Sequence, residues 1–228
     1  MNFFQKTIIG IDFNDYYAQL VEISLKDGKV ILESYNRTVL PLEVIRHGEI
    51  VDDKRFKEIL VSLLSTANPK PATSKNIAIV FPSGKVFTHI FKFPRNLEDD
   101  DIKKSLEFEA ETVIPFIISD VYWDFTILET DDKSKYVLFV SITKSIADKY
   151  CGMLEDIDVV PLIFGVDVEA LKCSAISQLK TDEAFLVIDI NAFSINYLII
   201  KNSIIKHAFS SSNGAIELIE ELSKANSS

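Results

Sequence analysis

The sequence has few cysteines, no long apolar run and no signal peptide at its start. It contains only two cysteines, Cys151 and Cys173, and their separation fits no metal-binding or redox motif. We therefore expect reduced, buried thiols, as in a cytoplasmic protein. No stretch approaches the roughly 20 apolar residues that span a bilayer. The short apolar start runs directly into Asp12, unlike a signal peptide. We expect a cytoplasmic protein that reaches the inner face of a membrane only through a partner.

Positive charge is also scarce, since 24 Lys and Arg stand against 34 Asp and Glu, for a formal net charge of −10. Nucleic-acid binding and direct docking on anionic lipid both need clustered basic side chains, so neither is expected. No Ser–His–Asp or Cys–His arrangement is visible in the sequence, which argues against a hydrolytic triad and leaves no catalytic residue to name. The histidines are isolated from one another: His47, His89 and His207.

Apolar segments of two periodicities are present instead, and together they predict an α/β protein. Strands are predicted over residues 7–13, 17–24, 29–39, 76–81, 86–93, 121–128, 136–142, 159–166, 185–190, 194–200 and 204–210. A helix that begins at Asp52 or Asp53 is predicted to follow the third strand along the chain. Further helices are predicted over residues 97–114, 144–155, 167–177 and 214–224. We expect the strands at 136–142 and 159–166 to pair in parallel.

The chain contains the same unit twice. Residues 11–14 (Ile-Asp-Phe-Asn) recur as residues 188–191 (Ile-Asp-Ile-Asn), and each copy ends a strand that leads into a three-stranded meander. The hairpin turns are predicted at 27–28 and 202–203. Backbone N–H groups in such a turn can face phosphate oxygens while the acid holds hydrated Mg²⁺, so two facing turns can clamp a nucleotide. Alternatively, each acid only caps its own turn.

Four stretches of the chain carry recognisable motifs. Two include the ends of the repeated strands, residues 10–12 with 21–23 and residues 187–189. A third is a strand closed by proline, residues 90–94. The most specific is an acidic helix at 107–111, followed by a proline stop at 114–116 and an aromatic strand at 121–125. Together these stretches resemble the PilM family of actin-like ATPases.

This resemblance implies an actin-like fold, in which a ribonuclease H-like unit of mixed sheets flanked by helices is duplicated. Residues 1–74 and 135–180 would form the first subdomain, residues 75–134 a small inserted α+β subdomain, and residues 181–228 the start of the second subdomain. It also implies ATP between the halves. The family holds the cytoplasmic N-terminal tail of PilN, an inner-membrane protein of type IV pilus assembly, in a groove beside the inserted subdomain.

The resemblance assigns ATP contacts to the two hairpins, with water-mediated Mg²⁺ contacts at the two aspartates. These positions are Asp12, Asn14, Asp15, Gln19, Asp189, Asn191 and Ser194. Asn14 and Asn191 stand where glycine lets the backbone approach phosphate. Gln19 replaces a lysine, and Asp15 adds a carboxylate that repels a triphosphate. The chain also stops one helix after the second meander, before the family's adenosine loop. We therefore expect weak or no ATP binding and little or no ATPase activity.

The leading hypothesis is a scaffold that binds a partner's tail as an extended strand in an apolar groove. Its groove residues are guessed from the position of the inserted subdomain: Phe87, His89, Phe91, Ile114 and Phe116. The same phenylalanines also fit a simple core. The alternatives are a working actin-like ATPase, a cell-division protein of the FtsA type, and a type II secretion platform protein. A three-stranded sheet with an open edge also invites pairing with a second copy of the chain.

Overall fold

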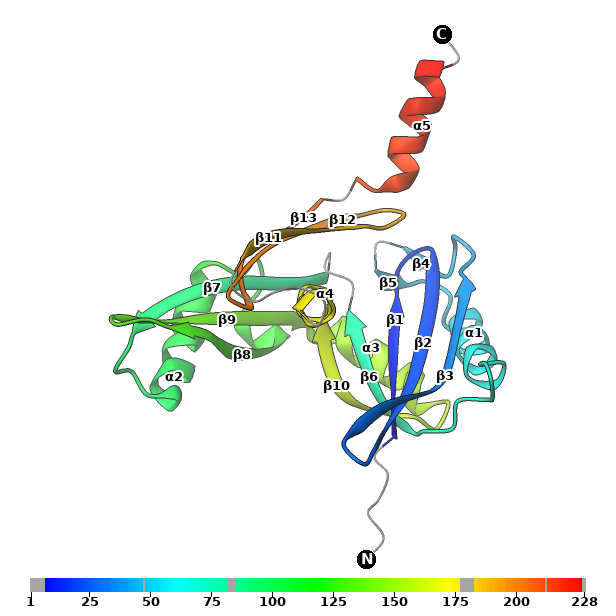
Figure 1. Ribbon diagram of the computed structural model, residues 1–228, viewed down its shortest axis with the longest axis horizontal. Helices are drawn as coiled ribbons and strands as arrows, with labels where there is room; N and C mark the ends of the chain where they lie inside the picture. The colour runs from blue at the N-terminus through cyan, green and yellow to red at the C-terminus, as the bar shows by residue number, and fades with distance from the viewer. Residues whose placement is uncertain (1–6, 47, 82–84, 177–182, 212, 227–228) are drawn as a thin grey trace, which may run out of the picture.

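The computed structural model describes residues 7–46, 48–81, 85–176, 183–211 and 213–226. His47 and the expected helix end at residue 177 lie outside these ranges. A five-stranded sheet in the order β10-β6-β1-β2-β3 organises the first part of the chain (Figure 1). Its strands are β1 (Thr7–Phe13), β2 (Tyr17–Lys26), β3 (Lys29–Val39), β6 (Asn76–Phe81) and β10 (Val160–Val166). Strands β1, β6 and β10 run parallel, so their carboxyl ends meet at one edge.

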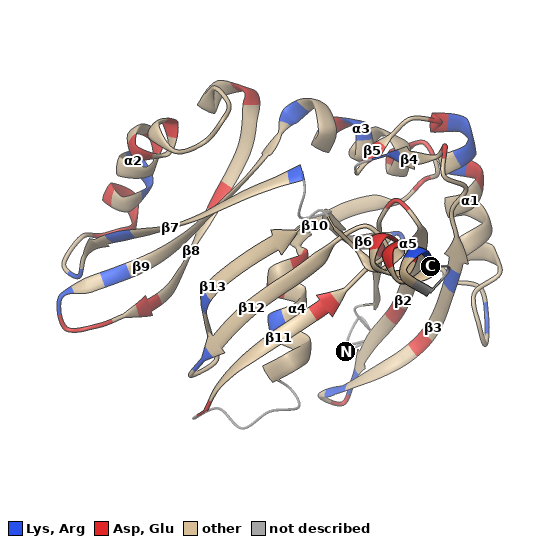
Figure 2. Cartoon of the chain, turned by 90° about the horizontal axis from the view of Figure 1, so that it is seen from above, with Lys and Arg blue, Asp and Glu red and all other residues tan. Residues whose placement is uncertain are grey.

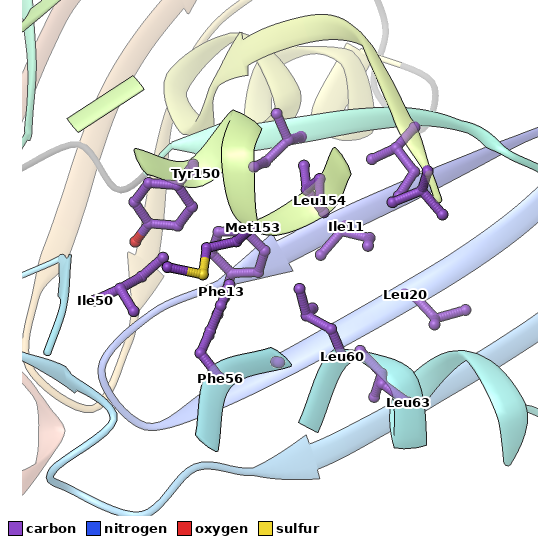
Figure 3. Packing of buried hydrophobic residues seen from close by; sticks show 14 of the residues in the cluster. Ile11, Phe13, Leu20, Ile50, Phe56, Leu60, Leu63, Tyr150, Met153 and Leu154 are labelled. Atoms are coloured by element: carbon purple, nitrogen blue, oxygen red, sulfur yellow. The ribbon is translucent and has the colours of Figure 1, made fainter. Parts of the chain in front are cut away.

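Two helices cover one face of this sheet, α1 (Asp53–Ser65) and α3 (Lys144–Glu155). The predicted cap is confirmed at Asp52, whose Oδ1 accepts a hydrogen bond from the Arg55 N–H at 2.9 Å. A short ribbon of β4 (Ile45–Arg46) and β5 (Glu49–Ile50) packs beside α3. The core between the layers is aromatic at one end, where Phe13, Phe56 and Tyr150 meet (Figure 3).

A second, antiparallel sheet in the order β7-β9-β8 forms the inserted module. Its strands are β7 (Val86–Pro94), β8 (Val121–Thr130) and β9 (Ser134–Thr143). Helix α2 (Asp99–Glu109) covers one face and continues into the 3-10 turn Ala110–Thr112. A second 3-10 turn, Ile118–Asp120, directly precedes β8. The charged residues of α2 come in runs, with Asp99–Asp101 first, then Lys103 and Lys104, then Glu107 and Glu109. All of them are exposed, as expected for the solvent-facing side of a helix (Figure 2).

The expected parallel pairing of residues 136–142 with 159–166 is wrong. Strand β9 pairs antiparallel with β7 and β8, whereas β10 pairs with β6. The reason is local, because a tight turn at Asp131 joins β8 to β9. The Asp131 Oδ1 accepts the N–H groups of Lys133 and Ser134 at 2.8 and 2.7 Å. So short a connection returns the chain antiparallel to itself.

Sheet membership also differs from the expected boundaries of the inserted module, residues 75–134. Strand β6 lies inside that range but belongs to the five-stranded sheet, between β1 and β10. Strand β9 lies mostly outside it but forms the centre of the module's sheet. By strand pairing, the module therefore extends from β7 to β9.

The second meander is confirmed as an antiparallel sheet of β11 (Ala184–Ile190), β12 (Ile195–Lys201) and β13 (Ile204–Ser211). Its β12–β13 turn has positive φ at Asn202 and Ser203, as the β2–β3 turn has at Asp27 and Gly28. Helix α4 (Asp167–Ile176) packs beneath this meander and beside β10.

The last helix, α5 (Ala215–Asn226), projects away from the rest of the chain (Figure 1). Its start is fixed to the β11–β12 loop, because the N–H groups of Ala215 and Ile216 donate to the carbonyl oxygens of Asn191 and Ala192. Glycine at position 214 allows the chain to come this close to the loop, because a Cβ there would lie 2.3 Å from the Ala192 oxygen. None of the described helices is long and apolar enough to cross a membrane.

Candidate functional site

Three acids converge where the two meanders face each other. Asp12 lies near the end of β1, Asp167 directly follows β10, and Asp189 lies near the end of β11. Burial raises the pKa of Asp12 above its usual value, and repulsion from Asp167 and Asp189 raises it further. A hydrogen bond from Gln19 opposes this shift. Negative charge is thus concentrated at the point where the resemblance places nucleotide phosphates.

The first hairpin is closed by Asn14. Its backbone N–H donates to the Tyr17 carbonyl at 3.0 Å. Its Oδ1 accepts the N–H groups of Tyr16 and Tyr17 at 2.8 and 3.0 Å. This is an Asx-type turn, in which a side-chain oxygen stands in for a backbone acceptor. The donors that a phosphate-binding turn would present to its ligand are therefore engaged by the asparagine itself.

An amide side chain faces the acid in both hairpins. The repeat of residues 11–14 and 188–191 in the sequence does not reveal this pairing. Asp12 is the ladder partner of Gln19, whose Nε2 donates to Asp12 Oδ2 at 2.9 Å. Asp189 is the partner of Asn196, whose Nδ2 donates to Asp189 Oδ2 at 3.1 Å. The duplication therefore extends from the strand ends to the residue across the ladder.

The second hairpin closes in the same way as the first, because the Asn191 N–H donates to the Ser194 carbonyl at 2.8 Å. The Asn191 side chain is used differently. Its Nδ2 donates to Asp189 Oδ2 at 2.6 Å, and its Oδ1 accepts from the Tyr17 hydroxyl at 3.2 Å. Asn191 therefore faces the first meander.

Sequence reasoning missed three residues of the site: Tyr17, Asp167 and Asn196. Asp167 could have been found, because it directly follows an apolar strand, just as Asp12 and Asp189 lie near the ends of theirs. Tyr17 had no such signal, since its partner Asn191 lies 174 residues away. Asp15 was also assigned to the site, but its side chain contacts another segment: its Oδ1 accepts a hydrogen bond from the Gly48 N–H at 2.7 Å.

The side chains present do not suit a direct metal site or a triphosphate. Within the described residues, no group of three His, Cys, Asp or Glu is arranged to hold a metal ion. Asp12 Oδ2 and Asp189 Oδ2 each accept hydrogen bonds from neighbouring side chains. The Tyr17 hydroxyl, at 3.5 Å from Asp12 Oδ2 and 3.2 Å from Asn191 Oδ1, lies between the two hairpins.

A groove of about 940 Å³ lies where the inserted module meets α3. Its lining comes from the segment after α2 and from the start of α3: Ile114, Pro115, Phe116, Ile117, Asp120, Thr143, Lys144 and Ser145. Phe116 and Ile117 are 45% and 66% exposed. Two of the predicted groove residues, Ile114 and Phe116, are thus brought together here.

The other three predicted groove residues lie elsewhere. Phe91 is buried in the core between α2 and the module's sheet, and Phe87 packs against the same core. His89 lines a different groove, of about 750 Å³, between the module and β13. Alternation along β7 explains the two phenylalanines, because residues 87, 91 and 93 share the face that α2 covers.

Comparison with known proteins agrees with this architecture. The family model of the type IV pilus assembly protein PilM matches residues 10–224. Among solved structures, the chain is similar to the PilM-PilN type IV pilus biogenesis complex, with a TM-score of 0.82 and 17% identity. That match covers 96% of this chain and 65% of the other.

Two further structures have lower similarity. One is the cytoplasmic domain of EpsL, an inner membrane component of the type II secretion system of Vibrio cholerae, with a TM-score of 0.55 and 10% identity over 91% of this chain and 71% of that chain. The other is a Bacteroides thetaiotaomicron protein with an actin-like ATPase fold and unknown function, with a TM-score of 0.54 and 10% identity over 99% and 79%. The expected actin-like fold is confirmed, and the chain belongs to the PilM family of type IV pilus assembly proteins.

Proposed function

We propose that this chain is a scaffold of type IV pilus assembly that holds the cytoplasmic tail of a PilN-like inner-membrane protein. The observation that carries the proposal is the groove between the inserted module and α3, whose apolar side is formed by Ile114, Phe116 and Ile117. Exposed apolar side chains gathered in a groove are typical of peptide-binding surfaces. The similarity to a PilM-PilN complex supports a partner of this class.

Contacts around the groove support a preformed site. The Tyr122 hydroxyl of β8 donates to Asp148 Oδ1 of α3 at 3.0 Å. The Lys144 ammonium lies 5.5 Å from the centre of the Tyr122 ring. These contacts hold the module against α3, so an extended peptide would meet two sides that are already in place. Lower ordering cost on binding favours affinity. The protein would act in the cytoplasm, recruited to the membrane through the tail.

Binding of the tail should depend on the apolar side of the groove. A labelled N-terminal peptide of a PilN-like protein from the same genome would be titrated by fluorescence anisotropy. We expect Ile117→Asp to weaken binding by at least about tenfold, as removal of an interface anchor does. Leu32→Asp is the matched control, because Leu32 is 57% exposed but lies on β3 in the other sheet.

Two results would count against this proposal. Unchanged affinity of folded Ile117→Asp would remove the groove as the binding site. No saturable binding by the wild-type chain, or equal binding of a scrambled peptide, would remove the scaffold function itself.

We further propose that the chain has no working nucleotide site. The Asn14 side chain engages the turn's N–H groups, three acids gather at the phosphate position, and Tyr17 lies between the hairpins. A triphosphate would meet Coulomb repulsion there and would have to displace these contacts. Calorimetric titration should therefore show no saturable Mg-ATP binding up to roughly 1 mM, the upper end of common substrate constants. Stoichiometric binding at lower concentration would support the ATPase alternative.

A further inference from the structure

The hydroxyl of Tyr17 connects two parts of the fold that are far apart in sequence. Tyr17 begins β2 in the first meander, and Asn191 follows β11 in the second. The hydroxyl lies 3.2 Å from Asn191 Oδ1 and 3.5 Å from Asp12 Oδ2. Asp12 belongs to the same hairpin as Tyr17, so the hydrogen bond that the hydroxyl donates to Asn191 is the one that joins the two hairpins. It lies at the place where an actin-like fold would put a ligand between its halves.

Tyr17 is held in this position from both ends. Asn14 Oδ1 accepts the Tyr17 N–H at 3.0 Å and so fixes its backbone. The Arg37 guanidinium lies 4.2 Å from the centre of the Tyr17 ring, close enough for a cation–π contact. A ring fixed in this way loses little side-chain entropy when its hydroxyl forms a hydrogen bond.

Asn191 is oriented as well. Its Nδ2 donates to Asp189 Oδ2 at 2.6 Å, so its Oδ1 turns toward the Tyr17 hydroxyl. Asp189 in turn accepts from Asn196 Nδ2 at 3.1 Å. The acceptor for Tyr17 is therefore part of a continuous hydrogen-bonded network inside the second meander.

We propose that Tyr17 and Asn191 form a bridge that joins the two meanders and holds them in one arrangement without a nucleotide. This inference rests on the absence of a working nucleotide site proposed above. It assigns Asn14 and Arg37 as positioning residues for Tyr17, and Asp189 as the positioning residue for Asn191.

The protonation state of Tyr17 agrees with this role. Burial, followed by repulsion from Asp12 and Asp189, raises the pKa of Tyr17 to about 12. The phenol therefore remains a hydrogen-bond donor throughout the neutral range. The charges that face it are the carboxylates of Asp12 and Asp189 and the guanidinium of Arg37.

Hydrogen exchange tests the bridge. In Tyr17→Phe, the ring and its packing remain but the hydroxyl is lost. We expect amide exchange over residues 188–197 to become faster by about two- to tenfold, the range that corresponds to one net hydrogen bond. Tyr16→Phe is the matched control, because Tyr16 is the adjacent tyrosine, is 39% exposed, and shows no side-chain hydrogen bond among the interactions described. Equal exchange in the two variants would overturn the bridge.

A double-mutant cycle with Asn191→Ala provides a second measurement, since a merely structural Tyr17 would show no coupling to Asn191. If the bridge exists, the amides of the hairpins should exchange no faster in the double variant than in Asn191→Ala alone, because that single variant already lacks the bridge. Additive increases would reject it. Mg-ATP binding by the wild type is read separately by calorimetry. Binding there would contradict the absent nucleotide site, whereas unchanged exchange in Tyr17→Phe would contradict the bridge.

Discussion

Replacing Phe13 with alanine should lower the free energy of unfolding by about 3–5 kcal/mol, the usual cost of truncating a buried phenylalanine. Phe13 is 1% exposed and lies in the centre of the aromatic core. Its ring stacks on Tyr150 at 5.2 Å and meets Phe56 edge-on at 5.4 Å, which joins β1 to α3 and α1. The substitution would leave a cavity and remove the ring contacts through which β1 packs against α1 and α3.

Chemical denaturation monitored by circular dichroism measures this effect. The matched control is Phe108→Ala, because Phe108 lies on α2 and is 75% exposed. That variant should change the free energy of unfolding by less than about 0.5 kcal/mol. A similar small change for Phe13→Ala would contradict the packing described for this core. Because Phe13 separates Asp12 from Asn14, its loss should also disturb the first hairpin of the candidate site.

Replacing Glu22 with alanine should have the second largest effect, about 2–4 kcal/mol. Glu22 is 1% exposed in the middle of β2, and one carboxylate oxygen, Oε1, accepts the N–H groups of Thr73 and Ser74 at 3.0 and 2.7 Å. These bonds hold the segment that enters β6 against the sheet. Without the carboxylate, two backbone donors lose their partner, and each costs about 1–3 kcal/mol when it is left unpaired.

Glu22→Gln separates the hydrogen bonds from the charge. Glutamine keeps an acceptor oxygen of the same reach, so we expect this variant to lose less than half as much stability as Glu22→Ala in the same denaturation experiment. Equal losses in the two variants would mean that the negative charge, rather than its role as an acceptor, stabilises the segment. No loss in either would show that the 73–74 segment does not depend on Glu22.

The sequence by itself determined most of the helices and strands, though not the short β4–β5 ribbon, and it determined that one meander occurs twice. These properties depend on neighbours along the chain. The Asp27-Gly28 turn, the Asp52 cap and the apolar stripe of α1 are all recognisable from residues within a few positions of one another. The resemblance to the PilM family could also be recognised from sequence, because its motifs are short and lie within single elements.

Only the tertiary structure decided how distant segments meet. Strand β6 enters the first sheet between β1 and β10, Glu22 turns its carboxylate to a loop 51 residues away, and Tyr17 reaches Asn191 across 174 residues. Phe91 could equally have faced a groove or a core until α2 was seen to cover its face of β7. Local propensity does not specify these contacts, because each depends on which surfaces the folded chain brings together and on which polar groups must then find partners.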